Sequence, residues 1–476
     1  MKKTVISGRD AKQKVSHRGA RFLALALGML ILFSVTACST NGEKPPTPSE
    51  SVSPDIDNER PDETDKNAPD APDIDQDEAL KKIILAAPGT KLDNVKYDDI
   101  SASFRDALWR FADKTSRLAL GGDTNTNALY SPISLYYPLA MLEAGSKGAT
   151  RDGLRDLLGL SEQVGSEQLR KLYGLMTKED KESIEQIANS AWLSSVYRDQ
   201  LSQDWLDKLS NDFYASAFAA DFNDPATSEQ MNKWVKKATR DKIDPEFTPD
   251  FFGPDVLLAL INTIYYKSIW RGSYFEEQFN TEDTFHAPAG DIKVTFMNGG
   301  SSDAKHLEGD RWHAAQLDLV NGSIRFILPD AGITPEMLLK DETFLQDLQN
   351  GKWRQCDLAI AAPKFSYRTD IDLLEALEPI GVRELLQEDV DFSGMLKDDS
   401  TLLELAVSKI DQKTFIAFEE GGVEAAAATV VVVVPTSAPM PDDIVRITLD
   451  RPFLYVIEDD AGAPLFVGIV RNPKAS

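Results

Sequence analysis

Side chains that could perform catalysis are few and scattered in this sequence. Among its 476 residues it has four histidines, His17, His286, His306 and His313. His17 lies in the N-terminal leader, and the other three lie in loop-like surroundings. No metal-ligand spacing, phosphate-binding glycine loop or nucleophile elbow accompanies them. The sequence therefore argues against an enzyme, and it predicts neither a metal site nor a cofactor.

One of the two cysteines, Cys38, follows a segment with the form of an export signal, residues 1–37. A basic leader precedes an almost uninterrupted apolar run from Phe22 to Val35, which is short for a membrane span but suits a signal core. The run ends in Val-Thr-Ala-Cys, which resembles the lipobox of bacterial lipoproteins, whose cysteine is diacylated and becomes the new N-terminus. Two acyl chains give stable anchoring. We expect a lipid anchor at Cys38 and a domain facing outside the cytoplasm; the alternative is an ordinary signal peptide with a chance cysteine.

The other cysteine, Cys356, is left without an intrachain partner if Cys38 carries lipid, so no disulfide is expected. Its thiol could be a nucleophile, but its apolar surroundings, Cys356 to Ile360, are typical of a packed cysteine.

Composition and charge divide the chain and exclude one class of partner. The net charge of −26 argues against nucleic-acid binding, which needs a basic face. Residues 38–80 are acidic, rich in proline and poor in large apolar side chains, so they cannot bury enough surface to offset their ordering entropy. We interpret them as an extended tether, with an acidic interaction tail as the alternative. Residues 81–476 then form the folded domain.

Periodicity within the folded part predicts an α+β domain. Helical spacing extends from Ile100 to Leu118, a Ser-Pro start signal at 131–132 opens an apolar helix that Gly145 ends, and a short helix from Thr150 ends at Gly159. Alternation of period two then predicts strands at 257–266, 315–319, 324–328 and 358–362, and a C-terminal hairpin of 453–457 with 465–470.

One segment carries conflicting signals. Two glycines, Gly421 and Gly422, precede Val423 and Glu424, and then come four alanines, Thr429 and five valines. A proline-rich stretch, 435–441, follows. Glycine and proline favour an exposed loop, whereas the valines favour a strand. The signals agree if the segment has two conformations. As a strand, only the face that contains Val423 is free of charge, so that face could cover a core; a permanently buried strand is the alternative.

From about residue 95 to Pro473 the sequence resembles the serpin family. The similarity rests on the order and spacing of several motifs: Asn127–Ser134, Leu139–Leu142 and Gly145–Thr150; Asn232–Val235 with Thr239 and Ile243; Asn262–Trp270; Asp450–Leu454; and Phe466–Gly468 with Asn472–Pro473.

The resemblance implies three β-sheets, eight or nine helices and an exposed reactive-centre loop at about 420–445. Glu420 would mark the base of this loop, and its hinge would comprise Glu420, Gly421, Gly422, Val423, Glu424, Ala425, Ala426, Ala427, Ala428 and Thr429. A sheet-opening region would comprise Ser131, Ser134, Asn262, Gln412 and, where the loop enters, Trp270. Two positions depart from the family pattern: Gln412 stands where many members have histidine, and Val423 stands where threonine or serine is common. Because glutamine can donate and accept hydrogen bonds, we expect altered but retained control of sheet opening.

The family spacing places the scissile bond at Thr436–Ser437. The small, uncharged residues around it suit elastase-like or subtilisin-like proteases better than trypsin-like ones. The resemblance implies a monomeric suicide substrate: the target serine protease cleaves the loop, stays covalently attached as an acyl-enzyme, and is trapped when the loop inserts into the main sheet. The alternative is a non-inhibitory serpin that acts as a surface binding or structural protein.

Overall fold

The computed structural model describes residues 77–475 except 123, 161–164, 180–182, 253–255, 388, 398–406, 408–409 and 425–443. The chain divides into two units, Met1–Thr64 and Asp65–Ser476, and the described helices and strands all belong to the second. Four predicted features lie wholly or mostly outside the described residues: Cys38 with its signal, the tether up to residue 76, the hinge from Ala425 to Thr429, and the bond Thr436–Ser437.

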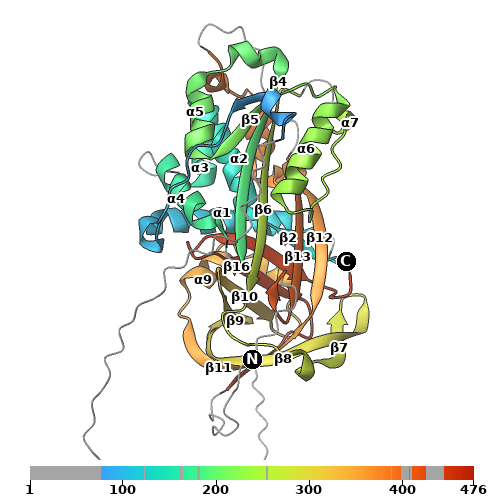
Figure 1. Ribbon diagram of the computed structural model, residues 1–476. Coiled ribbons are helices and arrows are strands. Elements are labelled where there is room, and N and C mark those ends of the chain that lie inside the picture. The colour runs from blue at the N-terminus through green and yellow to red at the C-terminus, as the bar shows by residue number, and fades with distance from the viewer. Residues whose placement is uncertain are drawn as a thin grey trace, which may run out of the picture. The chain divides into compact units, whose positions relative to one another are not determined.

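Helices are concentrated in the first part of the domain (Figure 1). The described residues form α1 (Ala102–Ala119), α2 (Pro132–Gly145), α3 (Gly148–Leu158), α4 (Ser166–Met176), α5 (Gln203–Asp212), α6 (Pro225–Ala238), α7 (Pro249–Phe252), α8 (Pro335–Leu339), α9 (Phe344–Asn350), α10 (Leu373–Ala376) and α11 (Val382–Gln387). The predicted boundaries of α1, α2 and α3 are confirmed to within two residues. The Ser131 hydroxyl caps α2 by accepting from the Ser134 N–H, and α3 ends where Gly159 adopts a left-handed φ of 65°.

The first sheet is the scaffold of the candidate site. Its strand order is β1 (Ile84–Ala86), β5 (Ala215–Ala220), β4 (Ile184–Ser194), β6 (Leu258–Ile269), β14 (Gly422–Val423), β13 (Asp411–Glu419) and β12 (Phe365–Asp372), with β3 (Lys178–Glu179) paired to β4. The two-residue β14 therefore lies between the long strands β6 and β13 and pairs with both of them. Figure 1 shows β6 and β13 as neighbouring long strands.

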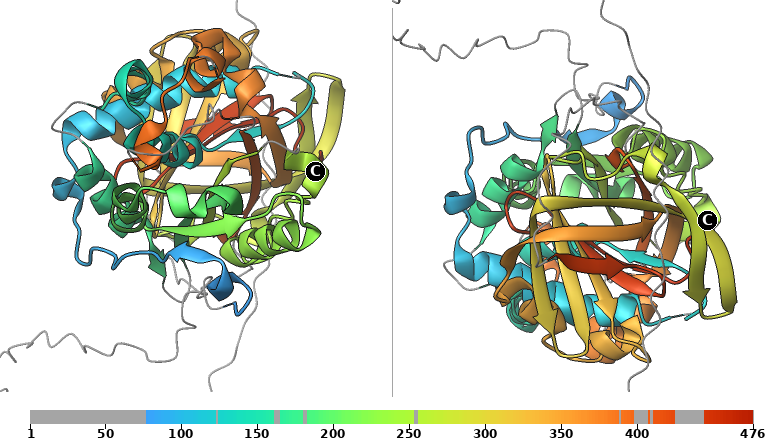
Figure 2. Two further views of the ribbon diagram at one scale, coloured as in Figure 1. Left: turned by 90° about the horizontal axis from the view of Figure 1, so that it is seen from above. Right: turned by 90° about the horizontal axis from the view of Figure 1, so that it is seen from below.

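The second sheet has the order β15 (Val445–Thr448), β11 (Arg354–Pro363), β8 (Gly290–Gly309), β9 (Trp312–Leu319), β10 (Gly322–Pro329), β16 (Phe453–Glu458), β17 (Pro464–Val470) and β2 (Ala128–Tyr130), with β7 (Thr281–Ala287) paired to β8. Figure 2 (right) shows the long β8 and β11 side by side. The strand β8 pairs with β7 over residues 290–296, with β11 over 296–306 and with β9 over 305–309. Because one long strand joins these partners, two of the three expected sheets are continuous with each other.

The helix count exceeds the expected eight or nine. The described residues form eleven α-helices, and the excess arises from segments of one turn, such as α7 and α10 with four residues each. None of the described helices has the length and apolarity needed to cross a membrane.

The predicted strands are present, and one assignment was wrong. His286, His306 and His313 lie within β7, β8 and β9 and not in loops. His286 and His313 are partly exposed and face Asp291 and Asp330, so they are polar, outward positions of these strands. Cys356 is half-buried on β11, as expected of a packed thiol, and burial raises its pKa.

Two apolar clusters hold the domain together. The larger lies between the two sheets and the helices and includes Val423. The smaller joins α6 to the far edge of the first sheet through residues such as Trp192, Phe218 and Trp234. Leu80, the last residue of the predicted tether, is buried in this smaller cluster.

Candidate site of loop insertion

The described part of the predicted hinge, residues 420–424, is already seated at one end of the first sheet. Gly422 pairs with Ile269 of β6 and with Glu419 of β13, and Val423 pairs with Ser268 and Phe418. The Val423 side chain is only 2% exposed and packs into the main core. This agrees with the prediction that the uncharged face, to which Val423 belongs, covers the core. Because valine is apolar and β-branched, the departure from threonine or serine does not prevent seating.

Only glycine fits the backbone at position 422. Its φ of +141° is rarely adopted by residues with a side chain, and an added Cβ would collide with the Ser268 carbonyl oxygen. The close approach of β6 therefore demands glycine. The predicted role of Gly422 as a hinge has this steric basis.

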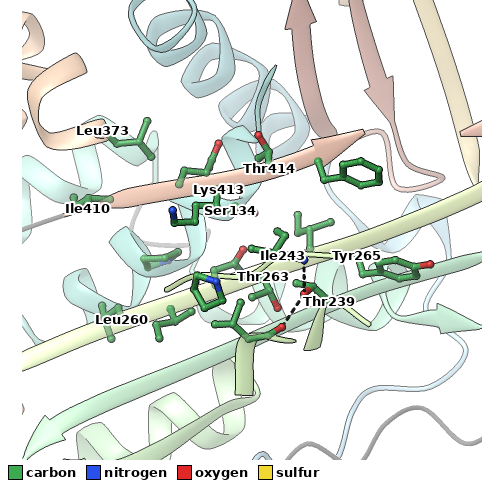
Figure 3. Close-up of a pocket in the computed structure, with 18 of the residues that line it drawn as sticks. Ser134, Thr239, Ile243, Leu260, Thr263, Tyr265, Leu373, Ile410, Lys413 and Thr414 are labelled. Atoms are coloured by element: carbon green, nitrogen blue, oxygen red, sulfur yellow. Dashed lines mark hydrogen bonds between the residues drawn. The ribbon is translucent and has the colours of Figure 1, made fainter. Parts of the chain in front are cut away.

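Beyond β14 the first sheet is split. Neither β6 nor β13 pairs directly with the other over its described length; each pairs with β14 and with its outer neighbour. A cavity of about 170 Å³ lies between them. Figure 3 shows Leu260, Thr263 and Tyr265 of β6 on one side and Lys413 and Thr414 of β13 on the other. Two strand edges that face each other unpaired are the arrangement that one further strand would complete.

Glu420 is fixed at the base of the loop. Its carboxylate accepts a hydrogen bond from the Asn280 amide and forms an ion pair with Lys364, which lies between β11 and β12. Burial alone would raise the pKa of Glu420, but the contacts with Lys364 and Asn280 hold it below its usual value. Glu420 is thus an anchored charge in the turn that joins β13 to β14.

Gln412 and Ser131 are brought together as predicted. The Gln412 Oε1 accepts from the Ser131 N–H at 2.7 Å, and its Nε2 donates to the Ser131 carbonyl at 2.9 Å. The Ser131 hydroxyl donates to the Leu465 carbonyl at 2.7 Å. Gln412 therefore uses both its donor and its acceptor to tie β13 to the start of α2, and the substitution of glutamine for histidine preserves a polar tie.

The other residues predicted to form a sheet-opening region lie near the same split. Ser134 and Asn262 line the cavity, and the Asn262 amide donates to Asn189 of β4 at 2.7 Å. Trp270 directly follows β6. Its backbone N–H donates to the Gly421 carbonyl at 3.2 Å, and its indole ring contacts the rings of Phe275 and Phe418. Ser134, Asn262 and Gln412 thus line the cavity. Ser131 is bonded to Gln412, and Trp270 is bonded to Gly421 beside β14.

Glu424 differs from its expected position. Alternation placed it on the charged, outward face, yet its side chain is only 8% exposed and pairs with Lys242 at 2.9 Å. Lys242 lies in the connection between α6 and β6, far away in sequence. The sequence held no signal for this pairing, because a lone lysine after a helix has many possible partners.

Comparison with known proteins identifies the fold. The sequence model of the family described as Serpin (serine protease inhibitor) matches residues 107–473. The chain belongs to the serpin family. It is 30% identical over 401 residues to alpha-1-antitrypsin of Meriones unguiculatus, and the match spans 82% of this chain and 94% of that protein.

Solved serpin structures agree with this assignment. The crystal structure of the thermophilic serpin tengpin in its native state matches with a TM-score of 0.68 at 26% identity, over 83% of this chain and 98% of tengpin. Thyroxine-binding globulin in complex with thyroxine matches with a TM-score of 0.64 at 22% identity, over 78% of this chain and 99% of that chain. At that identity the second likeness shows the fold alone.

Proposed function

We propose that this serpin inhibits serine proteases as a suicide substrate whose cleaved loop completes the first sheet between β6 and β13. The observation that carries the proposal is β14: a hinge with a buried valine and a required glycine, seated at the mouth of a split between two unpaired strand edges. The target serine attacks the Thr436 carbonyl carbon, and the Thr436–Ser437 bond breaks as the acyl-enzyme forms.

Completion of the sheet supplies the driving force. A strand of roughly a dozen residues would add about that many hydrogen bonds at about 1 kcal/mol net each. Valine burial adds about 5 kcal/mol, and ordering entropy opposes both. Strand addition and strain release are established behaviour of serpins. The uncleaved state is then metastable and held by a kinetic barrier.

The target is proposed to be an elastase-like or subtilisin-like protease. Its primary pocket must accept Thr436, which is small and uncharged, whereas a trypsin-like pocket prefers a cation. We also propose that Cys38 carries a lipid and that the acidic segment 38–80 holds the domain away from a membrane, outside the cytoplasm. Mass spectrometry of the exported protein tests this, since a diacylated cysteine at its N-terminus is expected.

The test mixes the full chain with an elastase-like protease and resolves the products on a denaturing gel. We expect a covalent band that contains both proteins, and a released fragment that begins at Ser437. The variant Val423→Arg should be cleaved without a covalent band, because arginine would place an unpaired charge in the core. The control Val196→Arg, at a side chain that is 76% exposed, should behave as the wild type.

Clean loop cleavage of the wild type, with neither a covalent band nor a change in thermal stability, would refute inhibition. It would favour the non-inhibitory alternative, a serpin that acts as a surface binding or structural protein.

A further inference from the structure

The Glu424 carboxylate is buried at the point where the hinge leaves the sheet. Val423 is the last residue of β14, and the Glu424 N–H still donates to the Ala417 carbonyl of β13 at 2.7 Å. Glu424 then adopts a φ of +52°, in the left-handed region that residues with side chains seldom occupy. This conformation ends the extended backbone of β14. Glu424 is therefore the first residue that must change conformation if insertion is to continue.

Lys242 connects the hinge to both sides of the split. It lies on the connection from α6 to β6, and it lines the cavity together with its neighbours Thr239 and Ile243 (Figure 3 labels these neighbours). Its ammonium group lies 2.9 Å from Glu424 Oε1 and 5.5 Å from the centre of the Phe415 ring on β13. One cation thus contacts the hinge and β13 from a segment that is covalently continuous with β6.

The other charged and titratable groups near Glu424 do not replace Lys242. Tyr265 and Lys267 of β6 face the carboxylate. Of the more distant cations, Arg240 pairs with Glu179, and Lys413 pairs with Asp370. Lys242 is the cation at ion-pair distance from Glu424 among the described residues.

We infer that the Glu424–Lys242 ion pair is a latch that holds the hinge seated and so regulates when the loop enters the sheet. This inference rests on the proposed function, because a latch on the hinge regulates inhibition only if the loop inserts. The Glu424 side chain is buried at 8% exposure, whereas that of Lys242 is 43% exposed, so loss of Lys242 leaves an uncompensated charge in the interior and removal of both charges does not. The two single variants should therefore differ. Lys242→Met leaves the buried Glu424 carboxylate without its cation, so the hinge should leave the sheet. Glu424→Gln leaves a neutral side chain, so the hinge should stay in place.

The test is hydrogen exchange of the full chain, read by mass spectrometry at two backbone amides. The Glu424 N–H pairs with β13, and the Trp270 N–H, next to β6, pairs with Gly421 of the hinge. Release of the hinge exposes both amides. We expect Lys242→Met to speed exchange at both by at least tenfold, and Glu424→Gln to leave them within threefold of the wild type.

The double variant Glu424→Gln/Lys242→Met separates a latch from mere packing. If charge compensation holds the hinge, the double variant regains the protection of the wild type. If Lys242 acts only by packing on Phe415, the double variant exchanges as fast as Lys242→Met, and the latch is refuted. The matched control is Lys236→Met: Lys236 is similarly exposed and pairs with Asp244 at 2.9 Å, but it does not contact the hinge. Its exchange at the two amides should equal that of the wild type.

Exchange is measured without a protease, so this result is independent of the test of inhibition. A protein that shows the latch but forms no covalent complex would refute the proposed function and leave the latch in place. A protein that forms the complex, with Lys242→Met exchanging as the wild type does, would refute the latch alone. If the experiments support both the latch and inhibition by loop insertion, Lys242→Met should change the rate of protease inhibition and Lys236→Met should not.

Discussion

The Asp459 carboxyl group is buried in the turn between β16 and β17. One of its oxygens accepts hydrogen bonds from the N–H groups of Ala461 and Ala463. Burial, opposed in part by these hydrogen bonds, raises the pKa of Asp459 from 3.8 to about 7. The native state therefore prefers the protonated acid, and the charged form is disfavoured there.

This shift predicts how stability depends on pH. Because the pKa of Asp459 is higher in the folded than in the unfolded state, its contribution to stability is complete below pH 4 and is lost as the pH rises through 7. A shift of this size corresponds to about 4 kcal/mol. Asp459→Asn keeps an oxygen for the two N–H groups but cannot ionise, so we expect a flatter profile. Urea unfolding between pH 4 and 8 measures it, with the more exposed Asp460→Asn as the control. An unchanged slope in Asp459→Asn would contradict the assignment.

Residue types predicted some single positions and could not predict others. Ser131 before proline indicates a helix cap, and adjacent glycines indicate a joint, because these are local properties of the backbone. The burial of Glu424 depends on Lys242, and that of Asp459 depends on how a turn packs against the rest of the domain. Contacts of this kind arise only from the tertiary fold.

At the scale of elements, the tie between β13 and α2 decides how firmly the split sheet is held. Ser131 is fully buried, and both its N–H and its carbonyl bond to the Gln412 side chain. In Gln412→Leu the Ser131 N–H and carbonyl would be left buried without that partner, at a cost of about 2–4 kcal/mol in the free energy of unfolding. β13 would also move more freely against α2.

Denaturant unfolding measures this cost. The control is Gln355→Leu, since Gln355 is exposed on β11 and its side chain bonds to the exposed Asp303; a change within about 0.5 kcal/mol is expected there. Gln412→His should recover part of the loss, because an imidazole can also donate and accept. Equal stability of Gln412→Leu and the wild type would show that the tie contributes nothing.

Elements with a strong period were predictable, and those set by tertiary contacts were not. The alternation over 257–266 predicted most of β6, and the C-terminal hairpin agrees with β16 and β17. The two residues of β14 are too few for any period, and β1 is a three-residue strand whose place is set by pairing with β5. The strand positions of two histidines were missed for another reason: His286 is an exposed residue between the buried Phe285 and Ala287, and His313 precedes the segment 315–319 in which the alternation was recognised.

At the scale of the whole molecule, the sequence motifs predicted the serpin fold but not the state of its sheet. Their order along the chain constrains the topology, whereas the split depends on which strand edges pair, and the short β14 is the strand that pairs with both β6 and β13. The structure shows that β6 and β13 are already apart over their described length. Insertion from this state would need no rupture of direct pairing between those strands, so the barrier must lie largely in the hinge and in the segments that cover the split.

The change in Tm on loop cleavage tests whether the inserted loop stabilises the split sheet. If insertion contributes about 10 kcal/mol after ordering entropy is subtracted, and a domain of this size has an unfolding entropy of about 0.8 kcal/mol per kelvin, cleavage should raise Tm by on the order of 10 °C. Calorimetry before and after limited cleavage near Thr436 measures it. Val423→Arg should show a much smaller rise, because a charged side chain at this buried position disfavours the seated hinge from which the loop would continue into the split, while Val196→Arg should respond as the wild type. A wild-type Tm that does not rise after cleavage would mean that the split sheet gains nothing from the loop, and the unpaired edges of β6 and β13 would then need another explanation.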